Sequence, residues 1–210
     1  MKVDFKRVGL VMLGFCILSF GIAAMRALGL GVDPFASFVI GVSHYLRLSF
    51  AITLVLMHLP FFILMCIKDR RLIGIGTLLG MTTVGFMVDF FYWMFGFVPV
   101  IDAGNHMAIN IVWLLPALVI FAFGIATYLV ADIGVVPYDS IGLVAEKLSK
   151  GKLKFKWVRV GADATCTVIG LTLGLMASIT TVGVATVITA VVLGPLISFF
   201  RGMISKRVKL

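Results

Sequence analysis

The chain has 210 residues, of which 61% are hydrophobic and 13% are charged, and its formal net charge is +9. A soluble domain has about 45–50% apolar and about 25% charged residues, so this composition, with a mean hydropathy of +1.17, excludes a soluble globular protein. Apolar and polar residues do not alternate at a period of two, which excludes an outer-membrane barrel.

Six apolar runs are long enough to cross a bilayer as helices, because a span needs about 20 residues. They are residues 8–28, 48–67, 72–97, 107–130, 158–178 and 181–200. We therefore predict an all-α integral membrane protein with six transmembrane helices. Two shorter apolar stretches, 34–46 and 137–146, would reach only about 20 Å as helices, so we expect each to be interfacial or re-entrant.

The basic residues predict the orientation of these spans. If the N-terminus is cytoplasmic, 16 of the 18 lysines and arginines fall on the inner side, and only Arg26 and Arg47 fall outside. This asymmetry is typical of the positive-inside rule. We expect a single membrane domain over residues 1–210 with both termini cytoplasmic. The positive charge then indicates topology and contact with anionic membrane lipid, not a nucleic-acid partner.

The sequence contains an internal repeat. Residues 20–43 align with 123–146 at an offset of 103, and 74–91 align with 183–200 at an offset of 109. Identical positions in the first block are Phe20, Gly21, Ile22, Ala23, Gly31, Val32, Pro34 and Ser37, and those in the second are Gly74, Thr77, Gly85, Phe90 and Phe91. Each half, residues 8–97 and 107–201, has three spans, so the halves insert in opposite orientations. This is an inverted 3+3 repeat, which is common among secondary transporters.

Each half carries a Gly-Val-x-Pro turn between its first span and its short helix. Gly31 and Gly134 can adopt positive φ, and Pro34 and Pro137 suit the first position of a helix. Asp33 is expected to cap the first short helix. These residues serve either as caps of a re-entrant bend or as binding groups. In the second case, the side chains of Asp33, Tyr138, Asp139 and Ser140 would line vestibules at opposite faces, the first turn lying outside and the second inside.

The GLGVDPF and DIGVVPYDS segments of these turns resemble the YczE/YyaS/YitT group of bacterial multispanning membrane proteins. The resemblance covers most of the chain and is clearest at the two turns. It implies a location in the bacterial plasma membrane. It implies no catalytic or binding residue.

We single out four ionisable residues of the predicted spans as candidates, because a charged or polar side chain there is costly unless it is paired or hydrated. They are Arg26, His58, Asp89 and Asp163. Arg26 can extend to the outer interface, His58 can bond a neighbouring helix, and Asp163 can pair with Arg159 one helical turn away. Asp89 has no basic neighbour on its own helix, and Arg26 is its nearest partner by depth. Asp89 is therefore the leading candidate for binding a substrate or an ion.

No nucleotide-binding, metal-binding or catalytic motif is present, and Cys16, Cys66 and Cys166 are isolated. We expect no enzyme activity, no cofactor, no metal and no catalytic residue. The sequence favours a small secondary transporter or flippase for an unknown small molecule or lipid, working by alternating access of the two halves. The alternative is a membrane scaffold that positions another protein. A monomer suffices for either function, and a homodimer is compatible with both.

Overall fold

The computed structural model describes residues 5–97 and 107–207, and these residues form eight α-helices and one short 3-10 helix. The first half contains α1 (Phe5–Ala27), α2 (Pro34–Leu46), α3 (Phe50–Lys68), the 3-10 helix η1 (Arg70–Leu72) and α4 (Ile75–Phe95). The second half contains α5 (Met107–Ala131), α6 (Pro137–Leu148), α7 (Phe155–Met176) and α8 (Val184–Arg207).

Six of these helices are long and apolar enough to cross a membrane, namely α1, α3, α4, α5, α7 and α8. They match the six predicted spans. The largest difference is at α8, which continues to Arg207 beyond the predicted end at residue 200. Its last turns carry Lys206 and Arg207, which favour a helix C-terminus because the helix dipole is negative there. The apolar run marks where a span ends but not where the helix itself ends.

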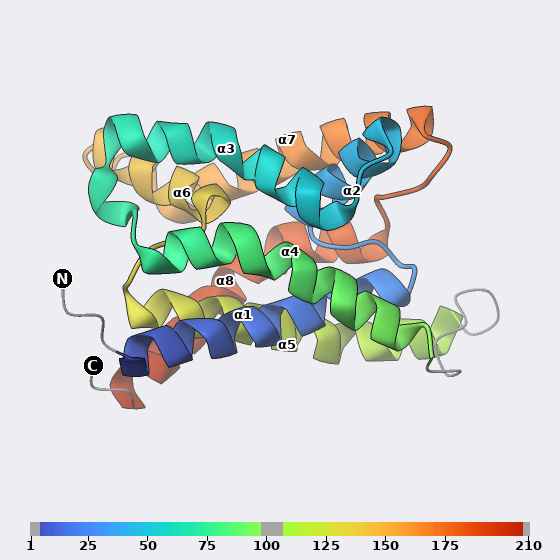
Figure 1. Cartoon of the computed structure of the whole chain (residues 1–210), viewed down its shortest axis with the longest axis horizontal. Helices are drawn as coiled ribbons and strands as arrows, with labels where there is room; N and C mark the ends of the chain where they lie inside the picture. Colours follow the sequence, from blue (N-terminus) through green and yellow to red (C-terminus); the bar gives the residue numbers. More distant parts are fainter. Residues whose placement is uncertain (1–4, 98–106, 208–210) are drawn as a thin grey trace.

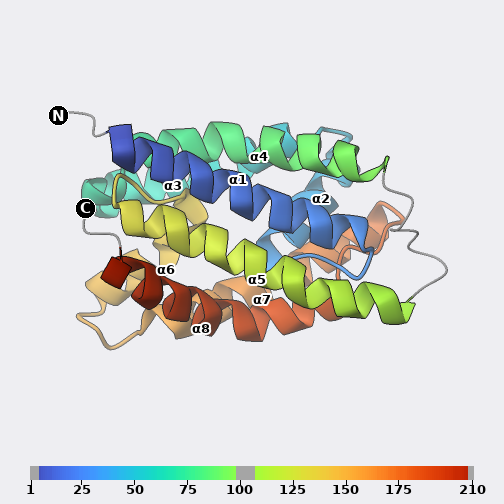
Figure 2. The same ribbon diagram turned by 90° about the horizontal axis from the view of Figure 1, so that it is seen from below.

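The helices form two layers, and the helix axes of both layers lie along the same general direction (Figure 1). The long-helix layer contains α4, α1, α5 and α8 side by side, as Figure 2 shows from below. The short-helix layer contains α2, α3, α6 and α7, with α2 packed along α7 and α3 packed against α6. Each layer therefore contains helices from both halves of the sequence.

Glycines allow the closest helix pairs within each layer to approach each other. In the long-helix layer, a Cβ on Gly14 would lie 2.7 Å from the backbone nitrogen of Tyr128. In the short-helix layer, a Cβ on Gly170 would lie 2.8 Å from the Cα of Phe38. Neither position accepts a side chain without a shift of backbone. These contacts join the two halves within each layer.

The two short helices begin inside the bundle. After α1, the chain turns back into the interior before α2 begins, and it does the same between α5 and α6 (Figure 1). The returning segments are held by the first turns of other helices. The amide of Ala185 donates to the carbonyl of Leu30 at 3.0 Å, and the amide of Gly76 donates to the carbonyl of Ile133 at 2.9 Å.

This arrangement corrects the expected position of the two turns. They do not lie in vestibules at opposite faces, because the first residues of both short helices are buried and meet in the interior. The stacked rings of Phe35 and Tyr138, with centroids 4.0 Å apart, mark this meeting point. A turn can lie there because its backbone groups are satisfied by the N-termini of α8 and α4, so the turn needs no water.

The outer surface of the bundle is apolar along the spans and basic at one end. Large side chains such as Phe86, Trp113, Val168 and Val191 are exposed, as expected for a surface that faces lipid. The start of α1, the α3–α4 turn, the α6–α7 connection and the end of α8 lie at the same end (Figures 1 and 2). There, the Lys147 ammonium donates to the Asp69 carboxylate, and this hydrogen bond lowers the pKa of that carboxyl below its usual value.

Candidate functional site

A cavity of about 60 Å³ lies between the two layers, where the short helices begin. Its lining residues are buried except for the half-buried Val136. Apolar lining comes from Leu18, Ile22, Phe35, Ala36, Phe50, Leu54, Val84, Phe121, Ile125 and Val136, and polar lining comes from Asp33, His58, Tyr128, Tyr138, Asp139 and Arg159. The volume has room for a few water molecules.

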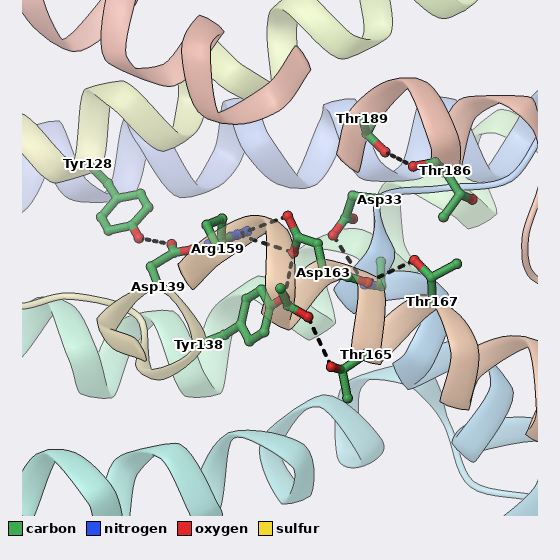
Figure 3. Close-up of polar contacts among 12 residues, drawn as sticks. Asp33, Tyr128, Tyr138, Asp139, Arg159, Asp163, Thr165, Thr167, Thr186 and Thr189 are labelled. Carbon is green, nitrogen blue, oxygen red and sulfur yellow. Dashed lines mark hydrogen bonds and ion pairs between the residues drawn. The ribbon is translucent and has the colours of Figure 1, made fainter. Parts of the chain in front are cut away.

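A buried polar network forms one wall of this cavity. The Arg159 guanidinium donates to the carboxylates of both Asp139 and Asp163, and its Nε lies 3.2 Å from Asp163 Oδ1. The hydroxyl of Tyr128 donates to Asp139, and that of Tyr138 donates to Asp163. Figure 3 shows these five side chains pointing toward one another. Arg159 thereby holds two carboxylates from different helices, α6 and α7.

The aromatic ring of Tyr138 connects this network to the first turn. The centre of the Arg159 guanidinium lies 4.4 Å from the centroid of that ring, which is a cation–π contact. The ring of Tyr138 also stacks on Phe35 with an interplanar angle of 10°. Phe35 in turn contacts the His58 ring, with centroids 5.2 Å apart. A continuous series of contacts therefore runs from Arg159 through the rings of Tyr138 and Phe35 to His58.

Two side chains at the cavity have polar atoms that are not satisfied within the described residues. Asp33 Oδ1 accepts from the amide of Ala36 at 3.2 Å, which caps α2 as predicted, but Oδ2 has no hydrogen-bond partner there. Both ring nitrogens of His58 also lack a partner in this part of the chain. The two side chains are 4% and 2% exposed. Buried polar groups are normally hydrogen-bonded, so these atoms are available to a ligand or to water.

Many of the residues that line the cavity are 103 positions apart in the sequence, the offset that aligns its two halves. Five pairs of its lining residues are related by the offset of 103: Leu18 and Phe121, Ile22 and Ile125, Asp33 and Val136, Phe35 and Tyr138, and Ala36 and Asp139. The polar members of these pairs differ between the halves. The apolar lining therefore comes from corresponding positions of both halves, whereas Asp33 and Asp139 have uncharged residues at the corresponding positions.

Comparison with known proteins places the chain in a family. Residues 5–202 match the model of a family of unknown function, DUF6198. The chain belongs to this family. No curated protein matches the chain, and no solved structure does. The site of this DUF6198 member must therefore be interpreted from its own geometry.

Asp89, the leading candidate from the sequence, does not line the cavity. Its Oδ1 lies 3.5 Å from Nη1 of Arg26, the basic residue expected to be nearest to it by depth. Its Oδ2 accepts from the amide of Ala51 at 3.2 Å, at the start of α3. Arg26 also lies over the ring of Tyr92 at 4.0 Å. In this DUF6198 member, the pair fastens α1, α3 and α4 together near one end of the bundle.

Because of these contacts, Asp89→Asn is expected to cost about 0.5–1 kcal/mol of unfolding free energy, since a partly exposed ion pair is worth no more. The amide oxygen can still accept from Ala51. Ligand binding in the central cavity is expected to stay at the level of the unchanged protein. Titration of the purified variant with denaturing detergent, beside a ligand-binding assay, measures both quantities. Loss of binding with intact stability would instead place Asp89 in the site.

The remaining predicted residues divide between the cavity and its frame. His58, Asp33, Tyr138 and Asp139 line the cavity, and Asp163 pairs with Arg159 as predicted. The other turn residues have local structural positions. Gly31 and Gly134 have φ values of +92° and +122°, Pro34 and Pro137 begin their helices, and the Ser140 hydroxyl donates to the carbonyl of Pro137 at 2.6 Å.

Sequence reasoning missed the role of Arg159 and Tyr128. Arg159 counted as a basic residue of the inner side, whereas the structure buries it to 8% exposure at the cavity. The position of Arg159 does indicate this burial. It follows the lysines of the preceding loop, lies one turn into an apolar helix and stands four residues before Asp163. Tyr128 gave no signal, because a tyrosine near the end of a span fits an interfacial position equally well.

Proposed function

We propose that this DUF6198 member is a small secondary transporter or flippase whose cargo passes through the central cavity. The observation that carries the proposal is the meeting of two short helices, each entering from one end of the bundle, at a cavity with charged lining. In transporters of this general design, substrate sites lie near the middle of the membrane, where interrupted helices end. Irregular backbone at that depth is tolerated where protein or a water-filled cavity surrounds it.

The inverted 3+3 repeat is a second part of the proposal. Its support is that equivalent contacts recur at the offsets found in the sequence. The bond from Ala185 to Leu30 corresponds to the bond from Gly76 to Ile133, with the same offsets of 109 and 103. The stacked Phe35 and Tyr138 are equivalent residues that touch each other. A pair of equivalent residues in mutual contact is expected at an axis that relates two halves.

Packing favours motion between layers over motion between sequence halves. The halves are joined in each layer by close helix pairs, α1 with α5 and α2 with α7. The cavity lies between the layers, with α1, α4 and α5 on one side and α2, α3, α6 and α7 on the other. Alternating access then consists of rocking the short-helix layer against the long-helix layer, which opens the cavity to one end at a time.

The scaffold function remains the alternative, and the two differ in a measurable property. A scaffold needs no access to its interior, whereas a carrier must expose its central site to both sides of the membrane. Ala36 is 3% exposed, lines the cavity and sits one helical turn from Asp33. A cysteine at this position therefore reports access to the site without altering a charged residue.

We expect Ala36→Cys, in a background with Cys16, Cys66 and Cys166 replaced, to react with a small membrane-impermeant thiol reagent from either face of sealed vesicles. The buried control is Ala126→Cys, which is 0% exposed and does not line the cavity. It should react from neither face. Labelling of Ala36→Cys from one face only, or from neither, would contradict the carrier and favour the scaffold.

A further inference from the structure

The central cavity has more negative than positive groups around it. Asp33 and Asp139 line the cavity, and Asp163 belongs to the polar network in its wall. The Arg159 guanidinium is shared by Asp139 and Asp163. The N-termini of α2 and α6 also face the cavity, and each contributes about half a positive charge. With the carboxylates ionised, about one unit of negative charge is left without a counterion. Buried charges are normally paired or neutralised, so a single positive charge would complete this set.

The buried polar atoms that lack a hydrogen-bond partner in the described part of the chain indicate where such a positive charge would bind. Asp33 Oδ2 is an acceptor without a donor among the described residues, and His58 presents two ring nitrogens in the same condition. A protonated His58 would be a buried cation with two unpaired donors, which is costly. The neutral ring instead offers one acceptor nitrogen. The cavity thus provides a carboxylate oxygen and an imidazole nitrogen, both acceptors, beside the ring of Phe35.

From these groups we propose that the cavity binds a small primary ammonium ion, with its N–H groups donating to Asp33 and His58. This inference deepens the proposed function, since it names the ligand class of the same cavity. An ammonium group has enough donors to satisfy both acceptors at once. A metal ion fits less well, because residues 5–97 and 107–207 contain no group of three or more histidine, cysteine, aspartate or glutamate side chains able to hold one. The volume of about 60 Å³ limits the ligand to a few non-hydrogen atoms in this conformation.

The test uses methylammonium chloride as the probe and the thermal unfolding of the purified full-length protein as the readout. Methylammonium is expected to raise the Tm in a saturable way, because a ligand that binds the folded state stabilises it. Sodium chloride at equal ionic strength and tetramethylammonium chloride should give no saturable rise. Tetramethylammonium carries the same charge but has no N–H donor and is larger.

Asp33→Asn is expected to weaken methylammonium binding by at least about tenfold, since it removes a charge-assisted hydrogen bond. The asparagine can still cap α2, so the fold should persist. The matched control is Asp132→Asn, which removes an exposed carboxylate outside the cavity and should bind like the unchanged protein. His58→Leu should also weaken binding.

Two results would overturn the inference. One is the absence of a saturable shift with methylammonium in the unchanged protein, which would mean that a proton or a different ligand neutralises Asp33. The other is an equal shift in Asp33→Asn. Neither result affects the labelling of Ala36→Cys from both faces, so failure of the ligand class is distinguishable from failure of the carrier.

Discussion

Replacing Arg159 with methionine is expected to lower the free energy of unfolding by about 3–5 kcal/mol, the usual cost of removing one partner from a buried ion pair. The guanidinium donates to Asp139 and Asp163, which lie on different helices and are both buried. Without it, the two carboxylates would share a low-dielectric interior, and the side-chain donors left to them among residues 5–97 and 107–207 would be the hydroxyls of Tyr128 and Tyr138. Denaturing-detergent titration of the purified variant measures the loss.

Two further variants separate this charge effect from a loss of packing. Arg70→Met changes the same residue type at an exposed position and should shift stability by no more than about 0.5 kcal/mol. Adding Asp139→Asn and Asp163→Asn to Arg159→Met should recover much of the loss, because neither of the two carboxylates that Arg159 held is then left as an unpaired charge. A cost below about 1 kcal/mol for Arg159→Met would show that Arg159 does not hold the centre of the bundle together.

Gly31→Ala and Gly134→Ala are each expected to destabilise the protein by about 2–4 kcal/mol, combining a strained backbone with a steric clash. Both glycines have positive φ. A Cβ on Gly31 would lie 2.6 Å from the amide nitrogen of Gly183, and one on Gly134 would lie 2.8 Å from that of Gly74. These amides belong to the residues that immediately precede α8 and α4, so relief would require moving the start of a helix. Thermal and detergent-induced unfolding of the two variants measure the effect.

The two variants should behave alike, because Gly31 and Gly134 occupy equivalent positions with equivalent neighbours. Gly202→Ala is the matched control. Gly202 lies within α8, and a Cβ there would meet no atom within 4 Å. That substitution should be neutral or slightly stabilising, since alanine favours a helix over glycine. Large destabilisation in one turn variant and none in the other would contradict the proposed equivalence of the halves.

The sequence predicts this fold well where the evidence is local. Span length and hydropathy locate the six long helices, and proline and aspartate at the turns locate the start of α2, whose first residue is Pro34. Expected depth also names Arg26 as the nearest basic partner for Asp89, because the predicted spans place both residues in the same half of the bilayer, and the two side chains do pair. Each of these features depends on a single segment of the sequence or, for the ion pair, on the expected depth of two residues in the membrane.

The depth of the two turns depends on long-range pairing and so escapes sequence reasoning. Leu30 accepts its hydrogen bond from Ala185, and Ile133 accepts from Gly76. Nothing near Leu30 in the sequence indicates that partner. Without it, a turn with open backbone groups is expected at the aqueous face. The cavity escapes prediction for the same reason. Asp33 and Arg159 come to line one cavity only after α2 packs on α7.

Distances between spin labels measure the proposed relative motion of the two layers. One pair joins residues 47 and 97, which follow α2 and α4 at one end of the bundle. The other joins residues 150 and 205, at the opposite end, beside α6 and in α8. In lipid vesicles, we predict two distance populations for each pair, with a longer distance at one end accompanied by a shorter distance at the other when methylammonium is added or removed. A single, unchanged population at both ends under all conditions would contradict alternating access and leave a rigid membrane scaffold as the function.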